Sequence, residues 1–284
     1  IYGVGLPTFE RRFGGYRPRV FFWSGLELGM WMTAGSLTAW WLWRCGILKR
    51  LMGVPFGTLV LPALLIVTLL CKASGALALL FVGMISLWGS ARFKTRFFLL
   101  TLVLISPIYC VARGSALWRG SDLVHFVQTM FDAERAKSLD FRFRNENVLI
   151  ERALERPFFG WSGYGRNLEV PMEKLLSQGL QERVVPDGLW IILFGTTGLV
   201  GLSALISLML LPAVLFLYRI PPEEWTDPRV APLTVLSVIL SLYMIDSLAN
   251  AMLNLIYNVS MGGLGSAILS YRRDASHASQ PVGL

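Results

Sequence analysis

The sequence predicts an all-α, multi-pass transmembrane helical bundle with a long polar loop that contains amphipathic helices. The chain of 284 residues is 54% hydrophobic and only 15% charged. Its mean hydropathy of +0.56 lies well outside the average for soluble domains. Most of its apolar runs approach the ~20 residues that a helix needs to cross a bilayer. One polar stretch, about Arg113 to Gly188, interrupts these runs with ten Lys/Arg and eleven Asp/Glu between Ser115 and Asp187.

Seven apolar runs are expected to be the spans of a single membrane domain over residues 1–284. They are Trp23–Trp43, Val54–Cys71, Gly75–Trp88, Phe97–Ala112, Leu189–Tyr218, Val230–Leu248 and Met252–Tyr271. The third run is short and must reach into its flanks or thin the bilayer. The fifth is long enough to hold a short helix, broken near Gly195–Gly198, ahead of the span proper. The tail Arg272–Leu284 is predicted to be disordered.

The charges of the short loops predict the orientation of the spans. The connections Arg44–Arg50 and Arg92–Arg96 are basic and contain no acid, and further arginines cluster at two other span ends. Alternation of the spans brings all of them to one side, which the positive-inside rule assigns to the cytoplasm. The segment Ile1–Phe22, the turn at Lys72–Gly75 and the polar stretch then share the opposite face.

The net charge of +8 is explained by the same loops, which adjoin lipid phosphate. Membrane lipids are therefore expected partners, and nucleic acid is not. The three cysteines, Cys45, Cys71 and Cys110, lack paired spacing and are expected to be packing residues. No metal site or cofactor is expected, because carboxylates and histidines never occur at ligand spacing. Since Ile1 opens the chain without a signal pattern, we expect further helices to precede it.

Within the polar stretch, apolar residues at helical spacing predict two amphipathic helices on the membrane face, Asp122–Lys137 and Glu146–Glu155. Pro157 ends the second helix. The glycines in Gly160–Gly165 then permit a tight loop whose amides are suited to face an anion or a sugar. A plain turn explains the same glycines.

Three motifs follow one another through the polar stretch and into the next span: Arg142; Pro157-Phe-Phe-Gly-Trp161 with Gly163 and Gly165; and Val185-Pro-Asp187-Gly-Leu-Trp190 followed by Gly195-Thr-Thr-Gly-Leu-Val-Gly201. In order and spacing they resemble the O-antigen ligase and polymerase superfamily of membrane glycosyltransferases. The similarity covers roughly Arg17 to Gly201. Two positions depart from the family pattern, since Asp187 replaces its proposed active histidine and Ser74 replaces the arginine of its Ser-Arg-Gly motif.

The resemblance implies transfer of an oligosaccharide from a polyprenyl diphosphate carrier to a hydroxyl of a glycan or lipid acceptor. It places this reaction at the periplasmic face of a bacterial inner membrane, in lipopolysaccharide or exopolysaccharide biosynthesis, without metal or cofactor. Such chemistry needs a base for the acceptor proton and cations for the diphosphate. Asp187 and Arg142 are the candidate catalytic residues. The candidate substrate-binding residues are Arg17, Arg19, Lys72, Arg144 and Arg166.

Other interpretations of the same residues remain open at this stage. Each basic residue has the alternative of pairing with an acid of the polar stretch or with lipid headgroups, and Asp187 fits an N-cap for the helix that follows it. For the whole chain, the alternatives are a transporter or flippase for a lipid-linked or anionic solute, and an inactive scaffold for polysaccharide assembly. The motifs do not separate a ligase from a polymerase.

Overall fold

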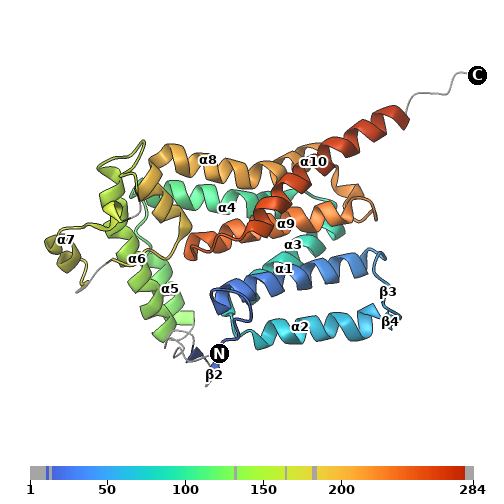
Figure 1. The fold of residues 1–284 in the computed structure, drawn as a ribbon, viewed down its shortest axis with the longest axis horizontal. Helices are drawn as coiled ribbons and strands as arrows, with labels where there is room; N and C mark the ends of the chain where they lie inside the picture. Colours follow the sequence, from blue (N-terminus) through green and yellow to red (C-terminus); the bar gives the residue numbers. More distant parts are fainter. Residues whose placement is uncertain (1–10, 13–14, 131–132, 164, 181–183, 279–284) are drawn as a thin grey trace, which may run out of the picture. The chain divides into compact units, whose positions relative to one another are not determined.

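The computed structural model describes residues 11–12, 15–130, 133–163, 165–180 and 184–278. The fold is all-α, as predicted (Figure 1). The described strands form two small hairpins, β1 (Arg11–Arg12) with β2 (Gly15–Tyr16) and β3 (Arg50–Leu51) with β4 (Val54–Pro55).

Helices occur at all seven predicted spans and within the polar stretch. In chain order they are α1 (Gly25–Arg44), the π-helical turn η2 (Phe56–Val60), α2 (Leu61–Leu70), α3 (Ser74–Phe93), α4 (Phe97–Gly114), α5 (Ser121–Met130), α6 (Ala133–Leu154), the 3-10 turn η3 (Arg166–Leu168), α7 (Met172–Ser177), α8 (Leu189–Arg219), the 3-10 turn η4 (Pro222–Glu224), α9 (Ala231–Ala249) and α10 (Leu255–Ala278). Four of them, α3, α4, α8 and α9, are long and apolar enough to cross a membrane. The chain is therefore a membrane protein with transmembrane helices.

Several helix boundaries differ from those that hydropathy predicts. The run expected to be short is a helix of 20 residues, α3, which continues through Arg92 to a left-handed cap at Lys94. In the polar stretch, α6 begins at Ala133 and runs through residues 138–145, which lie between the two predicted helices. Arg142 is therefore on a helix rather than in a loop. At the other end of the chain, α10 continues past Tyr271 to Ala278. In each case polar residues extend a helix that is already nucleated, which costs little.

Contacts group the chain into two compact units. The first comprises residues 1–103, 209–246 and 254–284, and the second comprises 104–208 and 247–253. Helices α4 and α8 contribute residues to both.

Helices of the first unit pack through small residues, as is usual for membrane helices. At Gly29 of α1, an added Cβ would lie 2.5 Å from the Cβ of Ala73 and 3.2 Å from that of Ala76. One turn later, the Thr33 hydroxyl donates to the carbonyl of Ala76 at 2.9 Å. Ser36 of α1 likewise shares a 2.8 Å hydrogen bond with Thr68 of α2. Close approach and buried hydroxyls thus hold α1 against both neighbours.

The break predicted after α9 also positions polar groups in the first unit. Helix α9 ends at Ala249 and α10 begins at Leu255. In the segment between them, the Asn254 Nδ2 donates to Glu27 Oε1 at 3.0 Å, and its backbone N–H donates to the Tyr243 hydroxyl. Trp23 N–H donates to the other oxygen of Glu27. Asn254 therefore links the start of α10 to the start of α1.

We expect Asn254→Leu to lower the free energy of unfolding by about 0.6–1.7 kcal/mol, the range measured for interhelical hydrogen bonds in membranes. The substitution leaves Glu27 without its amide donor while keeping a similar volume. Asn258→Leu on α10 is the control, and thermal unfolding in detergent is the measurement. Equal stability of the two variants would show that the Asn254–Glu27 bond adds nothing.

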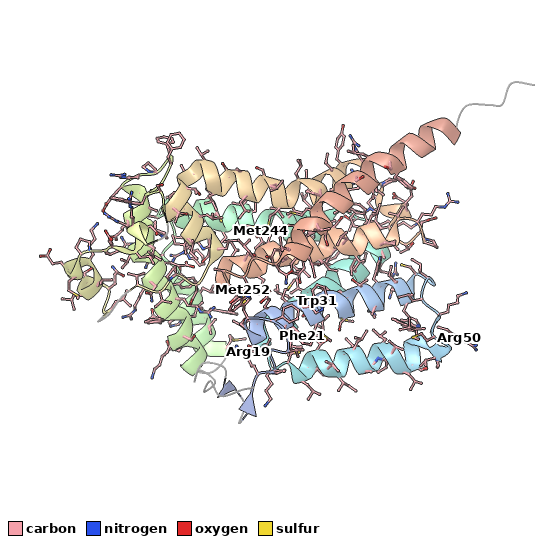
Figure 2. The ribbon with its side chains drawn as sticks, in the orientation of Figure 1. Arg19, Phe21, Trp31, Arg50, Met244 and Met252 are labelled. Atoms are coloured by element: carbon pink, nitrogen blue, oxygen red, sulfur yellow. The ribbon has the colours of Figure 1, made fainter. Side chains whose placement is uncertain are left out.

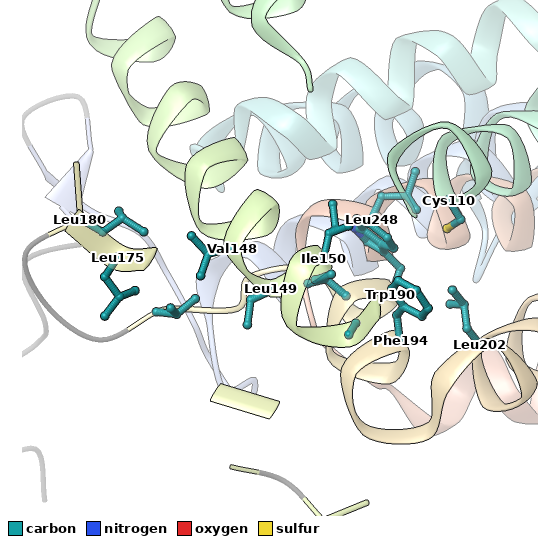
Figure 3. Close-up of a cluster of buried hydrophobic side chains, with 13 residues drawn as sticks. Cys110, Val148, Leu149, Ile150, Leu175, Leu180, Trp190, Phe194, Leu202 and Leu248 are labelled. Carbon is teal, nitrogen blue, oxygen red and sulfur yellow. The ribbon is translucent and has the colours of Figure 1, made fainter. Parts of the chain in front are cut away.

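The second unit is built around α6. Its core combines Val148, Leu149, Ile150 and Ala153 of α6 with buried residues of α8 and of the segments around α7, as Figure 3 shows. The first turns of α8 contribute Trp190, Ile191 and Phe194, all at most 1% exposed. The polar stretch therefore folds against the start of α8 and shares one core with it.

Candidate functional site

One face of α6 holds the segment that leads into α8. The backbone N–H of Val185 donates to Asn145 Oδ1 at 3.0 Å, and Trp190 Nε1 donates to Glu146 Oε1 at 3.4 Å. Arg142 lies three and four residues before these two α6 positions, on the same helical face. This face therefore reaches the segment at residue 187 as well.

Arg142 and Asp187, the two predicted catalytic residues, form an ion pair. The Arg142 Nε lies 3.2 Å from Asp187 Oδ2, and the two side chains are 37% and 39% exposed. The pair is thus reachable from solvent, while the backbone on both sides of Asp187 is fixed by Asn145 and by the buried Trp190. A carboxylate beside a guanidinium, both held on rigid elements, is an arrangement that can take a proton and bind an anion.

The other two predicted site residues of the second unit, Arg144 and Arg166, make different contacts from those of the Arg142–Asp187 pair. Arg144 points to a different side of α6, where its Nη2 lies 2.7 Å from Asp140 Oδ2 and its Nη1 donates to the carbonyl of Gln178. Arg166 is exposed and opens the short turn η3. The structure thus shows Arg144 paired with Asp140, an acid of the polar stretch.

The remaining predicted residues, Arg17, Arg19 and Lys72, belong to the first unit. Arg17 is buried, and its Nε donates to the carbonyl oxygen of Lys72 at 3.3 Å. Lys72 has a left-handed backbone (φ 52°) in the turn that leads to α3. Arg19 precedes α1, and its Nη1 donates to the carbonyl of Trp23 (Figure 2). The structure thus brings Arg17 and Lys72 together.

The two glycine motifs of the second unit contact each other. Gly198 breaks α8 with φ 65° and ψ −164°, which confirms the break predicted near Gly195–Gly198. The loop after α6 pairs with this break, because Leu199 N–H donates to Pro157 O at 2.7 Å and Trp161 N–H donates to Gly195 O at 2.8 Å. A Cβ on Gly198 would lie 2.4 Å from the Phe158 carbonyl. Gly160 and Gly198 therefore serve the close approach of two backbones.

A second ion pair, which is buried, is one that the sequence did not predict. Arg113, at the end of α4, is fully buried, and its Nη2 lies 2.9 Å from Glu146 Oε2. All five N–H groups of Arg113 have acceptors. These are Glu146 Oε2 twice, Asn147 Oδ1, and the carbonyl oxygens of Trp118 and Phe143. Because its donors are used, Arg113 acts as a structural tie between α4 and α6 rather than as a ligand-binding residue.

Glu146 is surrounded by donors. Besides Arg113, the hydroxyl of Tyr109 donates to it at 2.9 Å and Trp190 Nε1 donates to its other oxygen. Burial raises the pKa of the Glu146 carboxyl above its ordinary value, and Arg113 and the hydrogen bonds oppose this shift. The sequence does contain a signal for this residue. It occupies an apolar position of the α6 stripe, between the buried Phe143 and Ile150, and a charge at such a position needs a buried partner.

A pocket of about 30 Å³, the size of a single water, adjoins Arg113, Trp118 and Asn147. A larger one of about 470 Å³ in the first unit is lined by Tyr218, Arg219, Ile220, Pro221, Glu224, Ile268 and Tyr271. Neither lining includes a predicted site residue, so the candidate site rests on the Arg142–Asp187 pair and not on cavity shape.

Comparisons of the chain with protein-family models, with curated proteins and with solved structures find no match.

Proposed function

We propose that this protein is a metal-independent membrane glycosyltransferase that moves an oligosaccharide from a polyprenyl diphosphate carrier to an acceptor hydroxyl. The observation that carries the proposal is the Arg142–Asp187 ion pair. Sequence motifs single out these two residues 45 positions apart, and the fold places them in contact on an accessible surface. The topology we propose with it has seven spans, a periplasmic polar unit and a bacterial inner-membrane location, based on the positive-inside pattern.

The proposed reaction uses the two residues in separate roles. The acceptor oxygen forms a bond to the anomeric carbon of the donor sugar while the bond from that carbon to the diphosphate oxygen breaks. Asp187 takes the proton of the acceptor hydroxyl, and Arg142 stabilises the charge that develops on the diphosphate. Binding of the diphosphate to Arg142 competes with Asp187 for the guanidinium, so the substrate itself frees the carboxylate to act as base. Arg144 and Arg166, which lie in the same unit as the pair, remain proposed diphosphate contacts.

We expect Asp187→Ala and Arg142→Ala each to lower transfer at least ~10-fold in vesicles that contain the full chain, a polyprenyl diphosphate-linked oligosaccharide and an acceptor glycan. The matched control is Lys174→Ala. Lys174 forms an ion pair of 3.1 Å with Glu155 in the same unit, and its side chain is 40% exposed. Loss of this surface pair is expected to leave transfer unchanged.

The outcomes of this assay separate the three candidate functions. Unchanged transfer in both site variants would contradict the proposed mechanism. Failure of the unmodified chain to transfer at all, together with binding of the donor, favours a scaffold. Movement of the donor across the bilayer without transfer favours a flippase.

A further inference from the structure

The loop after α6 presents two large aromatic side chains to its surroundings. We name residues Pro157–Trp161 the aromatic loop. Phe158 is 65% exposed and Phe159 is 77% exposed. Their backbone is nevertheless rigidly held, because Leu199 N–H donates to Pro157 O and Val200 N–H donates to Phe158 O at 3.2 Å. The aromatic loop therefore lies at the level of residues 199–200 along α8.

The exposure of the α8 side chains changes at the same level. Before the Gly198 break, Trp190, Ile191 and Phe194 are at most 1% exposed and pack in the core of the second unit (Figure 3). After it, Leu199 and Val200 are 46% and 51% exposed. Trp190, Ile191 and Phe194 are thus covered by protein, whereas Leu199 and Val200, directly after the break, face outward although they are apolar. Leu202, one turn further along, is buried again.

The length of the helical part after Gly198 indicates where the membrane boundary lies. Gly198 divides the 31 residues of α8 into two helical parts, and of these only the part after Gly198 is long enough to cross the ~30 Å of hydrocarbon in a bilayer. From Leu199 to Tyr218 the sequence carries no charge, and Arg219 follows. Those 20 residues measure about 30 Å. One membrane boundary therefore lies at Arg219 and the other at Leu199.

We propose that the aromatic loop is a membrane anchor, in which Phe158 and Phe159 insert into the leaflet at the amino-terminal end of the Leu199–Tyr218 span. The partner is the lipid bilayer, and the contact is apolar burial at the boundary between headgroups and acyl chains. The anchor fixes the depth of the second unit, because the same loop is bonded to the start of the span and follows α6 directly.

The surroundings of the two phenylalanines match the chemistry of that boundary. Trp161 closes the aromatic loop, and Arg152 and Arg156 lie over its ring, with their guanidinium carbons 3.4 Å and 4.3 Å from the ring centroid. Tryptophan is enriched at the membrane interface, and arginine there binds lipid phosphate. The aromatic loop thus has two exposed apolar side chains, Phe158 and Phe159, and beside them a tryptophan that two arginines cover.

The test measures the depth of single labels in the full chain. Cys45, Cys71 and Cys110 are replaced by alanine, and a nitroxide spin label is attached to Phe159→Cys. The protein is reconstituted into vesicles of phosphatidylcholine and phosphatidylglycerol. Collision rates with oxygen, which concentrates in lipid, and with a water-soluble nickel chelate then report the depth of the label. Leu208→Cys, exposed on α8 within the span, is the lipid reference, and Ser177→Cys, exposed at the end of α7, is the water reference.

We expect the label at residue 159 to collide mainly with oxygen, as at residue 208, and to lie about 5–10 Å below the lipid phosphates. A label that collides mainly with nickel, as at residue 177, would overturn the proposal. Protection from both reagents would overturn it too, because protein rather than lipid would then cover the loop. Phe158→Cys is a second reporter if Phe159→Cys fails to fold. The readout is independent of catalysis, so a protein without transferase activity still tests the anchor.

Discussion

Replacing Arg113 with methionine is expected to lower the free energy of unfolding by about 3–5 kcal/mol, the cost of leaving one charge of a buried pair without its partner. Arg113 is fully buried, and it is the only cation among the recorded side-chain partners of Glu146 in the described structure. The substitution also removes the donor that Arg113 supplies to the Trp118 carbonyl and to Asn147 Oδ1. Chemical or thermal unfolding in detergent measures the loss. Lys174→Ala, which breaks an exposed pair, is expected to cost less than about 1 kcal/mol.

The loss in Arg113→Met is expected to depend on pH. Without the guanidinium, nothing cationic opposes the burial that raises the pKa of Glu146. Because the folded-state pKa then exceeds the unfolded value, the variant is most stable below the unfolded pKa and loses stability as pH rises through the folded pKa. The deficit relative to the unmodified protein should be smaller at about pH 5 than at about pH 8.

A second substitution tests whether the charge is the cause. Arg113→Met combined with Glu146→Gln removes both charges and leaves an amide whose oxygen accepts from Trp190 Nε1 and whose NH2 donates to the Tyr109 hydroxyl, at the positions of the two carboxylate oxygens. We expect the double variant to regain most of the lost stability, since neutral replacement of a buried pair is often tolerated. A double variant as unstable as Arg113→Met would show that lost packing, and not an unpaired carboxylate, is responsible.

Gly198→Ala is expected to lower the free energy of unfolding by about 3 kcal/mol, through backbone strain and a steric clash together. Gly198 combines φ 65° with ψ −164°, a region that side chains disfavour strongly. An added Cβ would lie 2.4 Å from both the carbonyl carbon and the oxygen of Phe158, and backbone atoms cannot move aside as a flexible side chain does. The clash also weakens the hydrogen bonds that the N–H groups of Leu199 and Val200 donate to the aromatic loop.

Gly163→Ala is the matched control for this effect. Gly163 has a positive φ of 36° in the same unit, but nothing lies within 4 Å of an added Cβ. Its substitution should therefore show the strain alone, about 1 kcal/mol. Comparison of the two unfolding transitions checks the difference. Equal losses would mean that contact between the aromatic loop and α8 is not what requires glycine at position 198.

Local features of the sequence were enough to predict that the protein is helical and membrane-spanning, and to predict the break in α8. Hydropathy over a window of residues predicts helices that lipid can surround, and a pair of glycines predicts where such a helix bends. They were less informative about helix ends. Ser90 and Arg92 lie in α3, and the residues before Glu146 continue α6, because an existing helix extends over polar residues at little cost.

What the sequence by itself determined is the class of the protein, the places of its helices and the position of the polar stretch among them. The tertiary structure alone decided which charges meet. Arg113 and Glu146 are 33 residues apart, and their pairing depends on how α4 packs on α6. Arg142 and Asp187 likewise meet because Asn145 and Glu146, one turn along α6, hold the start of α8. Hydropathy is a property of each residue in its own segment, whereas an ion pair depends on the packing of segments that are distant in the chain.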